Sequence, residues 1–273
     1  MSGANRLDTL FARLRSEGRI ALFPYLAAGY PDRASCARLL DLMARNGADG
    51  FELGIPFSDP LADGVTMQKA SARALAQGIT IADALDLVAG LRRNHQTPVT
   101  LMGYYNPFLA YGIERLCADA AQAGVDGFIV PDLPFEEAGE LQEHARRKGL
   151  HYVNFLAPTS PQSRIEMVGG SATGFVYCVA LVGTTGARRD LSPELAPFLK
   201  RARAAVSAPL VVGFGISTPA HVAGLVGQAD GAIVSSALAD LIERTPPERV
   251  DDAVATFVRE LHEATNGATT AAR

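Results

Sequence analysis

Two acidic side chains in one short stretch could share the work of a general acid and a general base. Glu52 stands inside the apolar run Phe51–Leu53, and Asp63 follows eleven residues later in a loop rich in Pro and Gly. Burial between apolar neighbours disfavours a charged carboxyl, so we expect the pKa of Glu52 to be raised toward neutrality. Two carboxyl groups that converge on one site can divide the acid and base roles. The alternative interpretation of Glu52 is a strand-end residue that caps a neighbouring loop.

Two further aspartates are expected to be structural. Asp59 and Asp132 adjoin Pro and are expected to make turn hydrogen bonds.

Three segments rich in glycine, serine or threonine late in the chain could hold a phosphate group. One is GFGIS at Gly213–Ser217, a second is VSSAL at Val234–Leu238, and the third is LVGTTGA, which contains Gly183 and Gly186. Glycines let backbone N–H groups approach an anion, and Ser236 can add a hydroxyl at the start of a helix. No single segment is specific, but together they favour a substrate that carries a phosphate.

Other common catalytic groups are poorly placed for chemistry. Lys69, Lys148 and Lys200 are the three lysines and all fall in helical segments, which argues against a Schiff-base enzyme. The five histidines are scattered, and none pairs with a carboxylate at the spacing of metal ligands, so no metal site is expected. The three cysteines are widely spaced and are expected to be buried small hydrophobic residues. With Schiff-base and metal chemistry disfavoured, the residues favour acid–base chemistry by carboxylates on a phosphorylated substrate.

Composition and charge exclude several other classes of protein. The net charge of −4 gives no general attraction for nucleic acid, and 48% hydrophobic with 20% charged residues does not describe a disordered chain. No apolar run approaches the roughly 18–20 residues that a membrane span needs. The amphipathic N-terminal segment lacks the apolar core of a secretory signal. We therefore expect a cytoplasmic protein that binds neither membrane nor nucleic acid.

An alternation of short apolar runs and longer helical segments has to position the candidate residues. Runs of strand length recur eight times, at Ile20–Leu26, Gly50–Leu53, Val99–Tyr104, Gly127–Val130, Tyr152–Leu156, Phe175–Val179, Leu210–Gly213 and Gly231–Val234. Helical periodicity separates them, as at Ala34–Asn46, Ile81–Arg93, Ile113–Ala123, Glu136–Lys148, Glu194–Val206 and Ala220–Gly227. Three junctions, NGADGFEL, QAGVDGFIV and VGQADGAIV, repeat one design of helix-ending Gly, turn with Asp, and strand.

Eight such units in 273 residues predict an α/β fold, a single (β/α)8 TIM barrel. The barrel domain is expected to cover residues 1–266, with a flexible tail at residues 267–273. An extra N-terminal helix at Arg6–Ser16 and extra peripheral helices, including Arg249–Ala264, are expected around it. A doubly wound open sheet is the alternative, which is less favoured because no G-x-G-x-x-G follows the first strand.

Five segments resemble one known family. They are FELGIPFSDPLADG (Phe51–Gly64), GYYNPFLAYG (Gly103–Gly112), VPDLPFEEA, the GTTG motif and GFGIS, and they occur in the family's order along essentially the whole chain. On these motifs the sequence resembles the α subunit of tryptophan synthase. The resemblance implies a lyase that cleaves indole-3-glycerol phosphate to indole and glyceraldehyde 3-phosphate. It also implies an α2β2 complex in which only the β subunit carries pyridoxal phosphate, so that this chain needs no cofactor.

The resemblance also implies a role for particular residues. Glu52 would protonate the indole carbon, Asp63 would accept the indole N–H, and Tyr177 would place Glu52 and the substrate. Thr185 would bond to Asp63 when the loop Leu181–Asp190 closes as a lid. The phosphate would be held by Gly186, Gly215, Ser235 and Ser236. The indole pocket would be lined by Tyr25, Met102, Ile129, Phe155 and Phe214, with barrel core as the alternative role of these apolar residues. The loop that faces the β subunit would contain Pro56, Asp59 and Pro60.

Four positions depart from the family's usual pattern. Val65 replaces a Pro, Ala180 and Leu181 replace a Ser and a polar or basic residue, and Ser235 replaces a Gly. Because most of these lie where the family contacts its β subunit, they bear on the coupling to a partner more than on the chemistry. A stand-alone lyase that releases free indole is therefore one alternative. A non-catalytic barrel that regulates a partner is another, which the presence of Glu52 and Asp63 disfavours.

Overall fold

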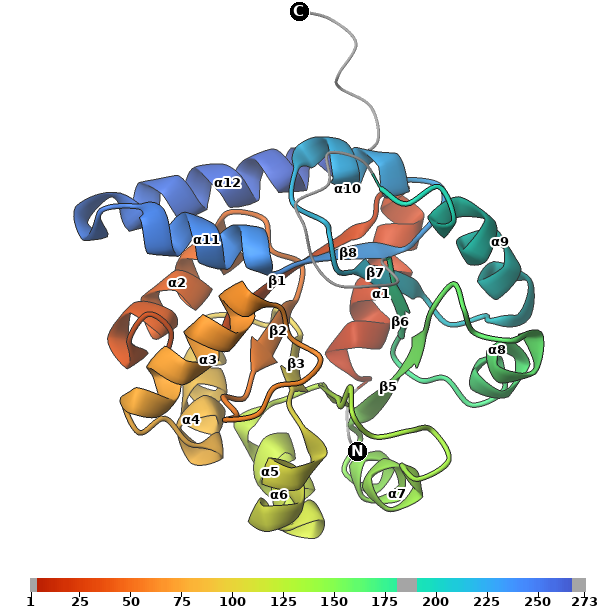
Figure 1. The fold of residues 1–273 in the computed structure, drawn as a ribbon, viewed down its shortest axis with the longest axis horizontal. Helices are drawn as coiled ribbons and strands as arrows, with labels where there is room; N and C mark the ends of the chain where they lie inside the picture. Colours follow the sequence, from red (N-terminus) through yellow and green to blue (C-terminus); the bar gives the residue numbers. More distant parts are fainter. Residues whose placement is uncertain (1–3, 181–190, 267–273) are drawn as a thin grey trace, which may run out of the picture.

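Eight parallel strands close into a barrel in their sequence order (Figure 1). The structure, a computed structural model, describes residues 4–180 and 191–266. The strands are β1 (Ala21–Ala27), β2 (Phe51–Gly54), β3 (Val99–Met102), β4 (Gly127–Ile129), β5 (His151–Leu156), β6 (Val176–Val179), β7 (Leu210–Gly213) and β8 (Gly231–Val234). Each coincides with one of the eight predicted strands to within a residue or two, and β8 pairs with β1 to close the sheet. The predicted (β/α)8 barrel is confirmed.

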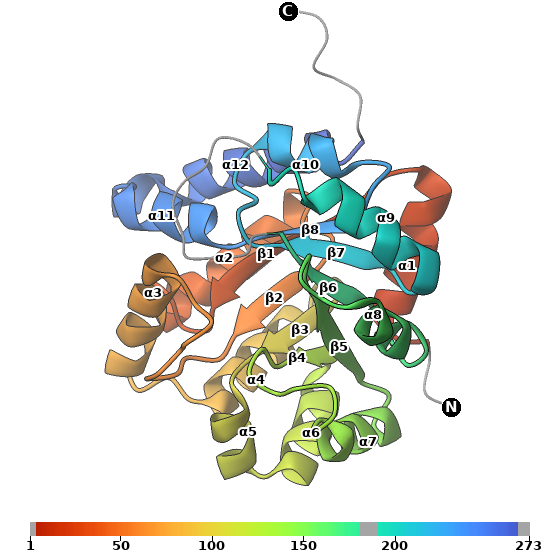
Figure 2. The same cartoon turned by 45° about the vertical axis from the view of Figure 1, so that its right-hand side comes forward.

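Helices surround the barrel as an outer ring (Figure 2). They are α1 (Arg6–Glu17), α2 (Arg33–Arg45), α3 (Val65–Ala76), α4 (Ile81–Leu91), α5 (Tyr105–Tyr111), α6 (Ile113–Ala123), α7 (Gly139–Arg147), α8 (Gln162–Gly169), α9 (Leu195–Ala205), α10 (Pro219–Leu225), α11 (Ser236–Arg244) and α12 (Val250–Ala264). The predicted N-terminal and C-terminal helices are present as α1 and α12. Helices α5 and α8 go beyond the predicted ones, whereas α3 contains Lys69, which the sequence places in a helical segment. The expected tail at residues 267–273 lies outside the described residues.

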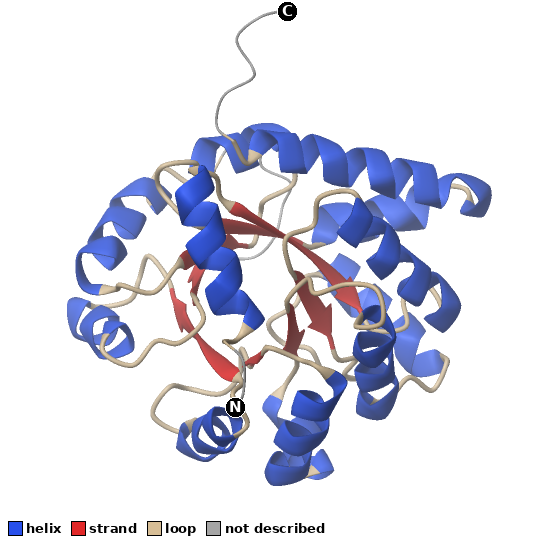
Figure 3. Cartoon of the chain, turned by 180° about the vertical axis from the view of Figure 1, so that it is seen from behind, coloured by secondary structure: helices blue, strands red, loops and turns tan. Residues whose placement is uncertain are grey.

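The N-terminal helix α1 closes one end of the barrel (Figure 3). Its Phe11 ring lies 6.1 Å from the rings of both Phe23 and Phe175, whose side chains come from the start of the barrel. The Phe23 and Phe175 rings are 5.7 Å apart. This aromatic cluster fills the N-terminal end, so the opposite end, where the strands finish, is left for chemistry.

Three aspartates latch the barrel at its helix–strand turns, at the junctions that share one sequence design. Each donates its backbone N–H to a carbonyl on the preceding strand and accepts that residue's N–H on its carboxylate, at 2.7–3.0 Å. Each carboxylate is also paired with an arginine. The sets are Asp49 with Leu22 and Arg19, Asp126 with Val99 and Arg92, and Asp230 with Leu210 and Arg203. The motif that recurs three times in the sequence therefore forms the same set of hydrogen bonds between neighbouring strands each time.

Among the described residues, no single helix is long and apolar enough to cross a membrane. Helices α3 and α4 together would be long and apolar enough, but the chain bends by 98° between them. All three cysteines are buried and unbridged, as expected.

Candidate active site

Glu52 is the second residue of the short strand β2. Its neighbours in register are Tyr25 on β1 and Thr100 on β3, and the flanking Phe51 and Leu53 are fully buried. Only 3% of Glu52 is exposed. Its Oε2 atom has no hydrogen-bond partner among the described residues. A buried carboxyl oxygen without a partner is costly, so the site favours either a proton on this group or a ligand against it.

The pKa of Glu52 is raised to about 8. Burial in an apolar strand end is the larger cause, because it disfavours the charged carboxylate, and the nearby charge of Asp63 adds to it. At neutral pH Glu52 is therefore largely a neutral acid that can give up a proton to a substrate. This outcome matches the raised pKa expected from the apolar run around Glu52.

Asp63 lies in the loop after β2, one residue before the N-cap of α3. The side chain is half-buried, and its backbone N–H donates to the Pro60 carbonyl at 3.0 Å. Burial raises the pKa of Asp63 to about 6, and a hydrogen bond with Tyr104 opposes that rise. At neutral pH Asp63 is mostly ionised while Glu52 keeps its proton. The structure thus brings the two predicted carboxyl groups together with different protonation states.

Two buried tyrosines contribute their hydroxyls to the same site. Tyr25 on β1 and Tyr177 on β6 are 8% and 5% exposed. The pKa of each phenol is raised well above its usual value, first by burial and then by the charges of Glu52 and Asp63. Both phenols therefore stay protonated across the physiological range and can serve as hydrogen-bond donors.

Aromatic rings form one wall of the site. Tyr177 lies between Phe155 on β5, at a centroid distance of 4.8 Å, and Phe214 after β7, at 5.9 Å. Phe214 has φ = 68° and is the non-glycine residue with positive φ in the described part of the chain. Such a backbone costs of order 1 kcal/mol or more, which the placement of the ring has to offset. Met102 and Ile129, paired in register on β3 and β4, are buried nearby along the sheet. These apolar side chains suit contact with a flat aromatic ring.

An anion could be held beside that wall. Gly215 follows β7 with φ = 79° and is exposed, and the nine-residue helix α11 begins with the exposed Ser236. Its N-cap, Ser235, makes no side-chain capping bond, so the first turn of α11 keeps N–H groups for a ligand. The predicted residues Gly186 and Thr185, like Leu181 and the rest of the expected lid, lie outside the described residues. Their roles stay predictions.

The loop expected to face a partner stands at the rim. Pro56 is buried, whereas Asp59 is exposed and accepts a hydrogen bond from the Ser58 hydroxyl, and Pro60 is half-exposed. Leu61 beside them is 93% exposed. Asp132, expected to bond within its own turn, instead accepts the backbone N–H of Tyr105 on its Oδ1 at 2.9 Å and so connects the loop after β4 to the start of α5.

Tyr104 is a site residue that the sequence analysis leaves unassigned. It follows β3 within the GYYNP segment, is 3% exposed, and its hydroxyl contacts both Ala62 and Asp63. Its place at the end of a predicted strand was the available signal. The hydrophobic periodicity of the sequence places Tyr104 at the end of a strand. It does not show that the Tyr104 hydroxyl reaches the loop that follows the neighbouring strand.

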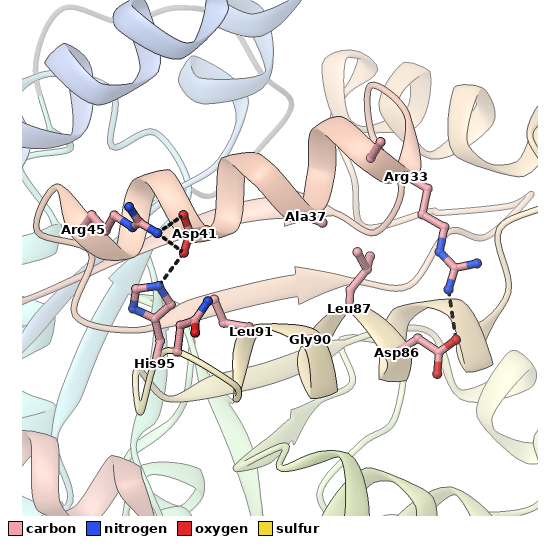
Figure 4. Close-up of a pocket in the computed structure, with 11 residues that line it drawn as sticks. Arg33, Ala37, Asp41, Arg45, Asp86, Leu87, Gly90, Leu91 and His95 are labelled. Carbon is pink, nitrogen blue, oxygen red and sulfur yellow. Dashed lines mark hydrogen bonds and ion pairs between the residues drawn. The ribbon is translucent and has the colours of Figure 1, made fainter.

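A groove of about 630 Å³ lies elsewhere, between α2 and α4 on the outer ring (Figure 4). Its polar side chains already have partners: His95 and Arg45 both contact Asp41, at 2.7 and 2.9 Å, and Arg33 binds Asp86 at 2.9 Å. Within the described chain, no three His, Cys, Asp or Glu side chains gather as a metal site. The barrel mouth is therefore the place where the raised-pKa carboxyl groups, apolar side chains and a helix N-terminus occur together.

The fold and this site define a (β/α)8-barrel protein with two carboxyl groups of raised pKa and a helix N-terminus at its mouth. Comparison with known proteins gives the family. The family model described as "Tryptophan synthase alpha chain" matches residues 11–266. The chain belongs to the tryptophan synthase alpha chain family.

Individual relatives are similar to this chain over nearly its whole length. The chain is 55% identical to the tryptophan synthase alpha chain of Chloroflexus aggregans over 263 residues, covering 96% of this chain and 98% of that one. It is 54% identical to the one from Roseiflexus sp., covering 94% and 99%. Among solved structures, tryptophan synthase subunit alpha from Legionella pneumophila superposes with a TM-score of 0.88 at 35% identity, covering 96% and 99%. A tryptophan synthase from M. tuberculosis in an aminoacrylate-bound form gives 0.86 at 30% identity, covering 96% and 100%.

Proposed function

We propose that this chain is a tryptophan synthase alpha subunit, a carbon–carbon lyase that cleaves indole-3-glycerol phosphate to indole and glyceraldehyde 3-phosphate for L-tryptophan biosynthesis. The observation that carries the proposal is the buried, neutral Glu52 beside the ionised Asp63 in a chain of this family. The reaction needs a proton donor at a ring carbon and an acceptor at the ring nitrogen. These two carboxyl groups match those needs.

The bond changes balance with these residues alone. Glu52 gives its proton to the ring carbon that carries the glycerol phosphate chain, while Asp63 accepts the indole N–H and stabilises the positive charge that develops. The bond between that carbon and the side chain then breaks, and its electron pair restores the aromatic ring. The side-chain hydroxyl becomes the aldehyde and loses its proton to the carboxylate left on Glu52. A positioned acid of this kind contributes roughly 10²- to 10⁴-fold in rate.

Substrate placement falls to the remaining groups. The phosphate would lie against Gly215, Ser235 and Ser236, with Gly186 from the lid. The indole ring would lie in the slot of Tyr25, Met102, Ile129, Phe155 and Phe214, and Tyr177 would orient Glu52. No Schiff base, metal or other cofactor has a part in this scheme.

We further propose a cytoplasmic α2β2 complex in which a pyridoxal-phosphate β subunit receives the indole. The rim loop with Pro56, Asp59 and Pro60 would contact that subunit, and the exposed Leu61 supplies an apolar surface for it. The relatives named tryptophan synthase support a partner of this kind.

Indole release tests the proposal. The purified chain is given indole-3-glycerol phosphate alone and then with the β subunit from the same source. Weak release that rises steeply with β supports the coupled subunit, whereas fast release that ignores β would show the stand-alone lyase. Glu52→Gln should lose nearly all turnover but still bind a substrate analogue that cannot be cleaved. If no indole is released in either case, the chain is not this enzyme.

A further inference from the structure

The phenol of Tyr104 joins the end of β3 to the loop after β2. The residue lies two positions beyond Met102, the last residue of β3, and it is nearly buried. Its ring packs on Phe57, with the centroids 5.2 Å apart and the planes 32° to each other. Its hydroxyl accepts the backbone N–H of Ala62 at 2.9 Å. One side chain thus contacts the loop near its start and near its end.

The phenol of Tyr104 also faces the carboxyl group of Asp63, because it holds the pKa of Asp63 below the value that burial alone would give, and the charge of Asp63 in turn raises the pKa of Tyr104. A phenol has one proton, and the Ala62 N–H already occupies a lone pair of its oxygen. The phenol proton is therefore left for another acceptor, and the ionised carboxylate of Asp63 is the better acceptor of the groups beside it.

The rest of the loop is anchored away from Asp63. The Ser71 hydroxyl on α3 accepts the Phe57 N–H at 2.8 Å and donates to the Phe57 carbonyl at 2.9 Å, which fixes the start of the loop. Between these anchors the chain is open to solvent, with Leu61 93% exposed. At the Asp63 end, Gln68 on α3 donates its side-chain amide to the Asp63 carbonyl at 2.9 Å, and Tyr104 adds a hydrogen bond from the end of β3 to Ala62.

We propose that Tyr104 is a positioning residue that aims the Asp63 carboxylate at the indole nitrogen by holding Ala62 and Asp63 with one hydroxyl. The inference rests on the proposed function, in which Asp63 accepts the indole N–H. It predicts that the ring of Tyr104 without its hydroxyl is not sufficient for this effect.

Tyr104→Phe removes the hydroxyl and keeps the ring. We expect kcat/KM for indole release to fall by about 10- to 100-fold, the range of one lost hydrogen bond to a charged group. The pH at which activity rises on the acid side should move upward, because the ionised form of Asp63 loses a donor. Raising the pH should then recover part of the activity. A merely structural role for Tyr104 would lower activity without moving the acid limb, the pH at which activity rises on the acid side of the profile.

Tyr111→Phe is the matched control. The Tyr111 hydroxyl also donates to an aspartate, Asp119, at 2.7 Å, but on the outer helices α5 and α6. This variant should leave both kcat/KM and the acid limb unchanged. Equal acid limbs in Tyr104→Phe and the unaltered chain, with kcat/KM within twofold, would overturn the proposal.

A direct titration separates this inference from the proposed function. With ¹³C-labelled aspartate, the Asp63 carboxyl signal, assigned by its loss in Asp63→Asn, should titrate at higher pH in Tyr104→Phe even if the chain releases no indole. If Tyr104→Phe does not fold, 3-fluorotyrosine at position 104 replaces it, because a more acidic phenol is a stronger donor. The Asp63 titration should then move to lower pH, and no movement would overturn the proposal.

Discussion

The hydroxyl of Tyr25 fills the space in which a side-chain carbon on Gly54 would stand. Tyr177 repeats this arrangement across the barrel, where its hydroxyl fills the space beside Gly213. In both cases a tyrosine lies over the last residue of the next strand, which has to be glycine for the ring to reach the mouth. The two phenols near Glu52 can therefore point in these directions only because residues 54 and 213 are glycines.

Gly54→Ala should displace Tyr25 and lower kcat/KM for indole release by about tenfold or more, because small misplacements at a reacting centre are costly. The matched control is Gly90→Ala in α4, where a Cβ meets nothing within 4 Å. That variant should keep full activity and gain roughly 0.5–1 kcal/mol of stability from helix propensity. Steady-state kinetics and urea unfolding give both quantities. Full activity in Gly54→Ala would show that Tyr25 has no part in the site.

The dependence of activity on pH should be bell-shaped. Asp63, with a pKa of about 6, has to be ionised to accept the indole N–H, so kcat/KM rises as pH passes that value. Glu52, with a pKa of about 8, has to be protonated to act as the acid, so kcat/KM falls above it. The substrate phosphate also titrates near pH 6, and its curve is measured by ³¹P NMR and divided out. A profile that stays flat from pH 7 to 10 would contradict the assigned acid.

Glu52→Gln should stabilise the fold at alkaline pH although it abolishes turnover. The folded pKa of Glu52, about 8, lies above the ordinary value of 4.5, so the folded chain holds this proton more tightly than the unfolded chain. The folding penalty is therefore absent below pH 4.5, grows as pH rises, and is complete above about pH 8. We expect Glu52→Gln to gain about 1 kcal/mol or more at pH 8.5 and nothing at pH 4.5, by urea unfolding. The exposed Glu260→Gln is the control, and a gain that does not vary with pH would refute the linkage.

Asp126→Ala should be strongly destabilising. Asp126 is 1% exposed and binds Arg6 and Arg92, each at 2.9 Å, while it latches β3 to β4 through Val99. Its loss leaves the largely buried Arg92 without its carboxylate, which costs about 3–5 kcal/mol. Asp86→Ala, which breaks an exposed pair with Arg33, should cost less than about 1 kcal/mol. Chemical denaturation measures both, and similar losses in the two variants would argue against the latch.

The sequence by itself determined the strand and helix pattern, and with it the barrel. Apolar runs such as Val99–Met102 and the Gly–Asp turns before Phe51, Gly127 and Gly231 are local signals, and each produced the expected element. Order along the chain also fixed that Glu52 would stand at a strand end. Its raised pKa was foreseeable because its apolar neighbours are adjacent in sequence.

The tertiary structure decided which side chains meet at the mouth. Closure of the barrel brings Tyr104, just after β3, together with Tyr25, Glu52 and Tyr177 on three strands. Hydrophobic periodicity along the sequence does not report these contacts. The bond from Tyr104 to the Asp63 loop depends on the direction of one hydroxyl, and the strained backbone of Phe214 depends on where its ring has to lie. Local patterns set the elements because they act between neighbours. Burial, charge and hydrogen bonding at the site act between residues that only the closed barrel makes neighbours.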